Sequence, residues 1–285
     1  MCRLFGFRSA IDSSVHRSLV AAENALAQQS QQHRDGWGIA YYLGPYPHVI
    51  RNDEQALNDV LFRELSGVVT TKTFLAHIRM ATAGLMVRVL NCHPFQHGRW
   101  TFAHNGELVG WHRPEVRQAV RDRVDERFRR YILGDTDSEV VFFVLLSFLA
   151  RRVENIQDEG VGATHLVPAL RDALSCVTEA APDLHEPKNN ALTVLLTNGN
   201  VMLGYRCGRE LYCSTHKSRC PERDTCYAFD AQRCEAAVGQ DGIVKHLIVS
   251  SEPVSEGPNV WRPLEENEYV CVDHGMNFRQ GQLVQ

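Results

Sequence analysis

Short runs of apolar residues, separated by turn residues, dominate the pattern along the chain. Two of these runs are joined by Asn198-Gly199, which is the strongest short signal for a β-hairpin. The β-branched and aromatic content of the runs predicts strands at residues 3–7, 38–43, 73–78, 100–104, 191–197, 201–205, 244–249 and 268–273. The first of these strands would tie the beginning of the chain into a sheet.

Three segments have apolar residues at helical spacing. The first follows a predicted N-cap at Ser13 or Ser14 and is marked by Val15, Leu19, Ala22 and Leu26. The second is expected to begin near Asp137 or Ser138 and to end near Arg152, and the third covers residues 166–180. Strands, then helices, then strands again predict an α+β layered domain built on antiparallel sheets.

The length and the charge of the chain argue against several classes of protein. Its 285 residues are enough to bury a substantial core. Its 30 Lys and Arg residues against 34 Asp and Glu give a net charge of −4, so nucleic acid is not an expected partner. The longest apolar stretch, residues 140–150, is shorter than the roughly 20 residues of a membrane span, and no secretory signal is seen. We therefore expect a cytoplasmic protein with no membrane partner.

The nine cysteines are expected to be reduced in that compartment, so each is interpreted as a core residue, a ligand or a nucleophile. Cys2 stands out because removal of Met1 would leave a free α-amine on a cysteine. That amine has an ordinary pKa of about 7.7–8.0, so one residue would carry both a nucleophile and its general base. On its own, Cys2 could equally be an ordinary cysteine at the start of a strand.

Seven further patterns change this interpretation, because they occur in one order along the chain. They are Met1-Cys-Arg-Leu-Phe-Gly, Asp35-Gly-Trp-Gly38, His77-Ile-Arg-Met-Ala-Thr82, Asn91-Cys-His-Pro-Phe95, His104-Asn-Gly106, Gly134-Asp-Thr-Asp-Ser-Glu139 and Ser250-Ser-Glu-Pro253. With them the chain resembles the class II glutamine amidotransferases, whose nucleophile is N-terminal. It is most similar to the stand-alone branch with the ergothioneine-pathway and glutathione-degrading members. The resemblance implies a four-layer αββα sandwich forming a single domain over residues 1–285.

The resemblance also implies roles for the catalytic residues. Cys2 would attack the side-chain amide, and Asn105 with the Gly106 backbone N–H would form the oxyanion hole. Preorganised donors of this kind each lower the barrier by about 3–4 kcal/mol. Without the resemblance, Asn105-Gly106 would be interpreted as a tight turn at a strand end.

The glutamine-binding residues follow in the same way. Arg79 matches the arginine that binds the α-carboxylate, and a guanidinium fits a carboxylate bidentately. Asp137 matches the aspartate that binds the α-ammonium, although its position is also that of a helix N-cap. Thr82 and His93 match positions that line the glutamine pocket. No cofactor and no metal is implied.

The substrate remains open at this point, because only about 30 residues follow Pro253 and no acceptor domain is recognised. Either ammonia passes to a separate ammonia-consuming or activating protein, or the enzyme hydrolyses a γ-glutamyl bond in a larger compound. Weak hydrolysis of free glutamine is expected in both cases. Two other classes stay in consideration: an N-terminal-nucleophile hydrolase of a different amide, and a non-enzymatic regulatory protein that retains the fold.

One segment departs from the family pattern, at about residues 206–236. It contains five cysteines, at positions 207, 213, 220, 226 and 234. Structural zinc sites usually pair cysteines two to four residues apart, and no gap here is that short, so a loop with partly buried thiols is favoured. We expect this insertion to contact the remote part of a substrate or a partner protein.

Overall fold

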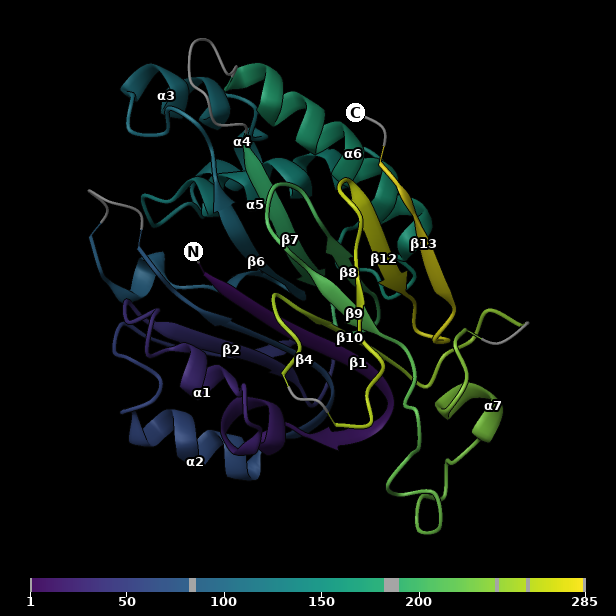
Figure 1. Ribbon diagram of the computed structural model, residues 1–285. Helices are drawn as coiled ribbons and strands as arrows, with labels where there is room; N and C mark the ends of the chain where they lie inside the picture. Colours follow the sequence, from purple (N-terminus) through teal and green to yellow (C-terminus); the bar gives the residue numbers. More distant parts are fainter. Residues whose placement is uncertain (1, 82–85, 182–189, 239–240, 255–256, 284–285) are drawn as a thin grey trace.

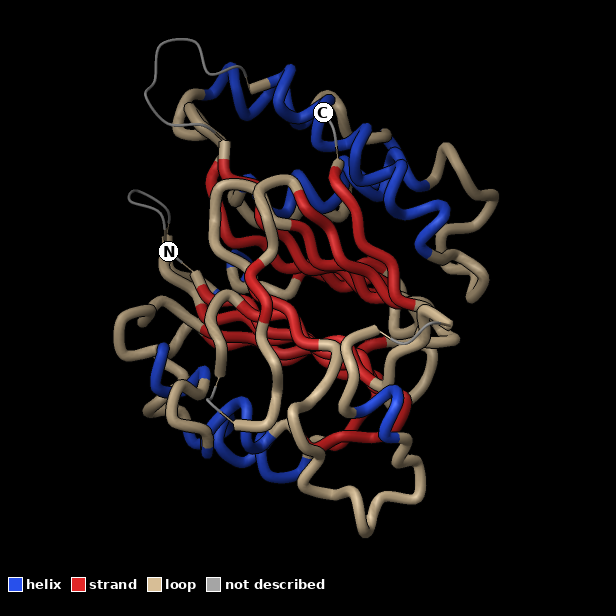
Figure 2. The backbone as a smooth tube through the Cα atoms, turned by 45° about the vertical axis from the view of Figure 1, so that its right-hand side comes forward, coloured by secondary structure: helices blue, strands red, loops and turns tan. Residues whose placement is uncertain are grey.

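Two antiparallel sheets stacked face to face form the centre of the structure, and helices cover both outer faces (Figure 1). The computed structural model describes residues 2–81, 86–181, 190–238, 241–254 and 257–283. Turned by 45°, the two sheets still appear as separate layers between the helices (Figure 2). The predicted four-layer αββα sandwich is confirmed.

The first sheet carries the start of the chain. Within the described residues it has seven strands: β1 (Arg3–Ser14), β2 (Trp37–Tyr42), β3 (Pro47–Asn52), β4 (Thr70–Ile78), β9 (Tyr212–Ser214), β10 (His246–Ser250) and β11 (Arg262–Pro263). Their spatial order is β11-β9-β10-β1-β4-β2-β3. The first strand therefore lies in the interior of the sheet, between β10 and β4.

The second sheet is built from the middle and the end of the chain. In the described part it has six strands: β5 (Phe95–His97), β6 (Trp100–Glu107), β7 (Ala191–Thr197), β8 (Met202–Tyr205), β12 (Glu268–Val272) and β13 (Phe278–Gln282). Their order is β13-β12-β8-β7-β6-β5. The predicted hairpin at Asn198-Gly199 is confirmed, since β7 and β8 pair around it and Gly199 has a φ of +89°.

Successive side chains along each strand point to opposite faces of the sheet, and the buried apolar residues therefore form three layers of core. In β1, Leu4 packs between the two sheets with Leu75 and Leu195, whereas Phe5 and Phe7 point to the other face. That outer face is covered by α1 (Leu26–Gln29), α2 (Val60–Val68) and the π-helical turn Arg17–Ala21. The second sheet is covered on its own outer face by α3 (Pro114–Arg121), α4 (Glu126–Arg129), α5 (Asp137–Leu149) and α6 (Ala163–Ala180).

Helix α5 is apolar on all sides because it is enclosed on all sides. Val140, Phe142 and Leu145 are fully buried between the second sheet and the neighbouring helices. The helix begins at Asp137, as expected, but its N-cap is Thr136, whose hydroxyl accepts from Glu139 N at 3.2 Å. The alternative role of Asp137 as the cap is therefore wrong, and its carboxylate is available for other contacts.

The first predicted helix is also wrong in form. Ser13 and Ser14 pair with Thr71 and Thr70 in the sheet, so β1 continues through both serines and neither of them caps a helix. The following residues form only the π-helical turn Arg17–Ala21 and the short α1. The apolar positions still mark the buried face, and tertiary pairing has overridden the local pattern.

The remaining helices differ from the predictions in their bounds or were not predicted. Two helices differ from their predicted bounds, since α6 begins three residues before the expected position and α5 ends at Leu149, three residues before the expected end. A further short helix, α7 (Ala231–Cys234), lies outside the two helical layers (Figure 1). In the described ranges, no helix combines the length and the apolarity that a membrane crossing requires.

Candidate active site

Cys2 lies at a junction of the two sheets. Its backbone nitrogen donates to Asn105 Oδ1 at 3.1 Å, and its thiol lies 3.4 Å from the backbone nitrogen of Met80. Asn105 belongs to β6, so a strand start in one sheet meets a strand end in the other. A pocket of about 350 Å³ opens here, and Cys2, Arg79, His93, Asn105, Gly106 and Asp137 are among its lining residues. Apart from Thr82, which lies outside the described residues, the structure brings together all the site residues predicted from the sequence.

The segment Ser250-Ser251-Glu252-Pro253 fixes the residues that follow Cys2. Ser251 Oγ accepts from Leu4 N at 2.9 Å, and Ser251 N donates to the Leu4 carbonyl oxygen at 2.9 Å. Glu252 forms an ion pair with Arg3. These contacts hold the start of β1 from the β10 side, so this segment positions the nucleophile and does not itself line the pocket.

Asn105 and Gly106 offer two donors beside the thiol. The Asn105 side chain uses its oxygen for Cys2 N, and its amide nitrogen has no partner among the described residues. Gly106 is required by close approach, because a Cβ at this position would overlap the Ala191 carbonyl oxygen on β7. The two residues therefore lie in a strand and not in the turn that local sequence alone would suggest.

Arg79 and Asp137 supply opposite charges to the same pocket. Arg79 is buried, its guanidinium makes only long contacts of 3.4 Å with the Asp35 and Met86 carbonyl oxygens, and it forms no ion pair within the described residues. Asp137 is also buried and accepts from Leu108 N at 2.7 Å and from Ser138 N at 2.7 Å. Buried charges normally have partners, so an unpaired guanidinium opposite a carboxylate suits a zwitterion.

The segment Asp35-Gly36-Trp37-Gly38 braces the residues around Arg79. Asp35 Oδ2 accepts from Ala81 N at 2.7 Å, and the Gly36 carbonyl oxygen accepts from Arg79 N at 2.8 Å. Gly36 has a φ of +119°, and a Cβ there would lie 2.6 Å from Cys92 Sγ. The Trp37 indole is fully buried and donates to Asp59 Oδ2 at 2.8 Å. The segment therefore supports the backbone at Arg79 and Ala81 from outside the pocket, and none of its four residues is among those that line it.

His93 lines the pocket but faces another histidine. Its ring centroid lies 4.1 Å from that of His77, and neither ring has a hydrogen-bond partner among the described residues. Burial, reinforced by neighbouring positive groups, lowers the pKa of His77 to about 3 and holds the pKa of His93 well below its usual value. Both rings are therefore neutral at neutral pH, with His93 in the lining of the pocket and His77 packed against it.

Seven residues that line the pocket were not predicted from the sequence: Met80, Ala81, His104, Glu107, Thr136, Ser138 and Arg209. His104 is buried and lies 2.9 Å from both Ser138 Oγ and the Ala191 carbonyl oxygen. His104 and Ser138 belong to the family-like segments, so their motifs were a signal. Arg209 belongs to the segment that departs from the family, and nothing local in the sequence points to it.

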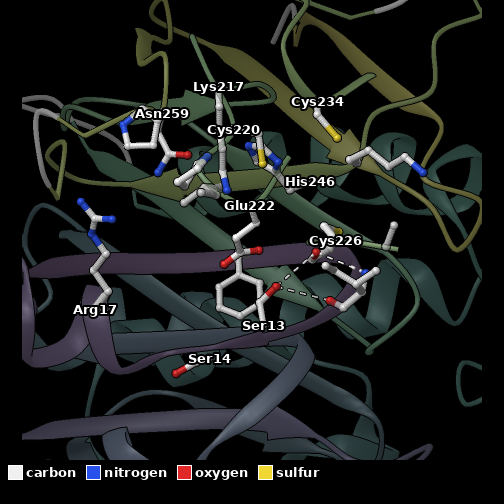
Figure 3. Close-up of a pocket in the computed structure, with 18 of the residues that line it drawn as sticks. Ser13, Ser14, Arg17, Lys217, Cys220, Glu222, Cys226, Cys234, His246 and Asn259 are labelled. Carbon is white, nitrogen blue, oxygen red and sulfur yellow. Dashed lines mark hydrogen bonds between the residues drawn. The ribbon is translucent and has the colours of Figure 1, made fainter. Parts of the chain in front are cut away.

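Most of the cysteine-bearing segment lies elsewhere. Cys220, Cys226 and Cys234 line a second cavity of about 400 Å³ on the outer side of β1, together with Lys217 and His246 (Figure 3). This cavity shares no lining residue with the Cys2 pocket. In the described ranges, no group of three or more His, Cys, Asp or Glu side chains is arranged to hold a metal. Of the residues at about 206–236, Arg209 alone is among those that line the Cys2 pocket, and contact of this insertion with the remote part of a substrate or with a partner protein stays a prediction.

The chemistry of the pocket follows from these contacts. Burial raises the pKa of the Cys2 thiol, while the backbone contact from Met80 and the Arg79 charge oppose that rise. A thiol with a raised pKa needs an adjacent base to become a nucleophile. The arrangement can hold an amino acid head group, expose a thiol to its side chain and offer donors to a developing oxyanion.

Comparisons with known proteins agree with this geometry. The family model for class-II glutamine amidotransferases matches residues 1–284. A putative glutamine amidotransferase of Escherichia coli, YafJ, is 26% identical over 76% of this chain and 77% of its own length. A γ-glutamyl-hercynylcysteine sulfoxide hydrolase of Mycobacterium tuberculosis is 30% identical over 37% of this chain and 49% of its own.

Two further matches concern length and fold. An uncharacterised protein of Methanocaldococcus jannaschii is 34% identical over 56% of this chain, but the match spans only 42% of that relative. A class-II domain protein of Silicibacter pomeroyi, at 20% identity, shares the fold over the full length of both chains with a TM-score of 0.62. With a family model matched from residue 1 to residue 284, the chain belongs to the class II glutamine amidotransferases.

Proposed function

We propose that this protein hydrolyses the side-chain amide of a γ-glutamyl compound through a thioester on Cys2. The observation that carries the proposal is the 3.1 Å contact between Cys2 N and Asn105 Oδ1, because it sets the thiol beside an amide donor that has no partner among the described residues. Arg79 and Asp137 line the same pocket and match the carboxylate and the ammonium of a glutamyl head group.

The proposed reaction uses the α-amine that removal of Met1 would expose on Cys2. The amine takes the thiol proton, and the thiolate forms a C–S bond to the amide carbon. The resulting oxyanion lies against Asn105 Nδ2 and the Gly106 N–H. The C–N bond then breaks as the leaving nitrogen takes the proton back from the α-ammonium. Water finally hydrolyses the thioester, which releases glutamate and restores the thiol.

The proposal also concerns the leaving group, which we expect to be larger than ammonia. The mycobacterial relative is named for hydrolysis of a γ-glutamyl bond, which supports a substrate larger than glutamine. Binding energy from the remote part of such a substrate can orient the amide, so hydrolysis of free glutamine is expected to be slow. A separate protein that consumes ammonia or activates the enzyme stays a prediction.

The test uses enzyme whose N-terminus has been verified by mass spectrometry. We expect hydrolysis of glutamine, glutathione or another γ-glutamyl compound to be lost in Cys2→Ala and kept in Cys176→Ala, a half-buried cysteine on α6 outside the pocket. A chain that retains Met1 should be inactive, because an amide nitrogen cannot act as the base. If Cys2→Ala keeps more than a few per cent of the wild-type rate on every cleaved substrate, the proposal is wrong.

A further inference from the structure

Arg209 brings a second guanidinium into the Cys2 pocket. Its side chain is half-buried, and its Nε is buried without a hydrogen-bond partner. No ion pair of the described residues involves Arg209. Glu107, which also lines the pocket, is exposed to solvent and does not pair with it. The Arg209 guanidinium thus lines the site without an ion pair to any described residue.

The backbone that carries Arg209 is firmly held. Thr193 Oγ1 lies 3.0 Å from the Arg209 carbonyl oxygen and accepts from Arg209 N at 3.2 Å. The same hydroxyl lies 2.9 Å from the Cys207 carbonyl oxygen and accepts from Cys207 N at 3.0 Å. Between them, Gly208 has a φ of +76°, and its N–H donates to Glu266 Oε1 at 2.7 Å. The loop therefore has a fixed place against β7.

That place is adjacent to the oxyanion donors. Thr193 pairs with Asn105 across β6 and β7, so the Thr193 hydroxyl anchors Arg209 one strand away from the side chain that contacts Cys2. A cation whose backbone is fixed at the edge of the pocket can act on a bound substrate without first ordering a mobile loop.

The charges of the pocket exceed what a glutamyl head group can satisfy. That head group carries one carboxylate and one ammonium, and Arg79 and Asp137 match them one to one. A partly buried guanidinium is stabilised by an anion that accepts its fork of hydrogen bonds. We infer that Arg209 binds a carboxylate on the leaving-group side of the substrate, so that the preferred substrates are γ-glutamyl amides of acidic amines. This inference rests on the proposed function.

Matched substrates test the inference directly. We would measure kcat/KM for γ-glutamylglycine and γ-glutamylglycinamide, which differ in one carboxylate. The wild-type enzyme should prefer the acid by about tenfold or more, as expected for a charge-assisted hydrogen bond. In Arg209→Gln the preference should fall to about twofold or less, and Arg209→Lys should lie between them because it keeps the charge but loses the fork. Arg219→Gln, an exposed arginine of the same segment outside the pocket, should keep the wild-type ratio.

The possible results separate this inference from the proposed function. Equal use of both substrates by the wild type would overturn the inference. So would an equal loss on both substrates in Arg209→Gln and Arg209→Lys, because Arg209 would then share the α-carboxylate with Arg79. If neither dipeptide is cleaved while glutamine hydrolysis depends on Cys2, the inference fails and the proposed function stands. Hydrolysis that persists in Cys2→Ala would instead contradict the proposed function.

Discussion

His104 Nδ1 lies 2.9 Å from Ser138 Oγ, and the same hydroxyl lies 3.2 Å from Asp137 Oδ1. His104 Nε2 faces the Ala191 carbonyl oxygen, which can only accept, so Nε2 carries the ring proton. Burial lowers the pKa of His104, so the ring is neutral and Nδ1 is an acceptor. The single proton of Ser138 then serves the histidine, and Asp137 keeps a lone pair for an ammonium.

Ser138→Ala should therefore have two effects. It leaves Nδ1 buried without a donor, which should lower the free energy of unfolding by about 1–3 kcal/mol. It should also raise KM for glutamyl substrates, because Ser138 lines the pocket beside Asp137. Urea unfolding and steady-state kinetics measure the two effects. Ser147→Ala is the matched control, since this buried serine of α5 contacts Phe143 and Asp125, outside the pocket, and should affect stability alone.

Arg79→Lys and Asp137→Asn should each weaken recognition of the head group. Lysine keeps the charge but loses the bidentate fork, and we expect kcat/KM to fall about tenfold or more, mainly through KM. In Asp137→Asn, kcat/KM should fall much more for glutamine than for glutaramate, which lacks the α-amine. Unchanged binding of the glutamine analogue 6-diazo-5-oxo-norleucine by either variant would show that the head group lies elsewhere.

Ser251→Ala tests whether the end of β10 positions the nucleophile. The substitution removes the acceptor of Leu4 N two residues from Cys2, so it should destabilise the fold by about 1–3 kcal/mol and lower kcat with little change in KM. Ser250→Ala removes only a 3.3 Å contact to a carbonyl oxygen that Ser251 N already serves, so its effect should be smaller. Equal kcat values for the two variants would contradict the positioning role.

Acid should destabilise the protein through its buried histidines. The pKa of His77 is about 3 in the folded protein and about 6.5 in the unfolded chain. The unfolded chain therefore binds the proton first, so the free energy of unfolding is highest above about pH 6.5 and decreases as the pH falls toward 3. At pH 5 the loss from this one group should be about 2 kcal/mol. In His77→Phe the free energy of unfolding should depend less steeply on pH between 7 and 5, whereas His112→Gln, at an exposed position, should keep the wild-type slope. Identical slopes for wild type and His77→Phe would contradict this account.

Local patterns predicted the parts of the fold that local interactions determine. The hairpin at Asn198-Gly199 and the range of β7 followed from turn chemistry and β-branched content alone. The predicted helix after Ser13 failed because pairing with Thr70 and Thr71 extends β1, and that pairing depends on a segment more than 50 residues away. Sequence periodicity identified the buried positions there without fixing their backbone conformation.

The same distinction applies to the candidate site. Cys2, Arg79, Asn105, Gly106 and Asp137 could be predicted because their motifs occur together and in one order along the chain, and the structure gathers them. Arg209 could not be predicted, because its place depends on a Thr193 hydroxyl that no pattern in the segment 206–236 reveals. For Asp137, the sequence was compatible with both a cap and a ligand, and only the Thr136 contact separates the two roles.

The place of β1 between β4 and β10 also has a consequence for biosynthesis. The contacts with β4 become available once about a quarter of the chain has emerged from the ribosome, but Leu4 and Ser251 are 247 positions apart. Since chains grow at about 5–20 residues per second, the start of β1 stays undocked on its β10 side for many seconds. During that time the start of β1 lacks its contacts with Ser251, and the beginning of the chain is open to processing enzymes. Hydrolytic competence should therefore arise only when translation has reached Ser251, in the last eighth of the protein.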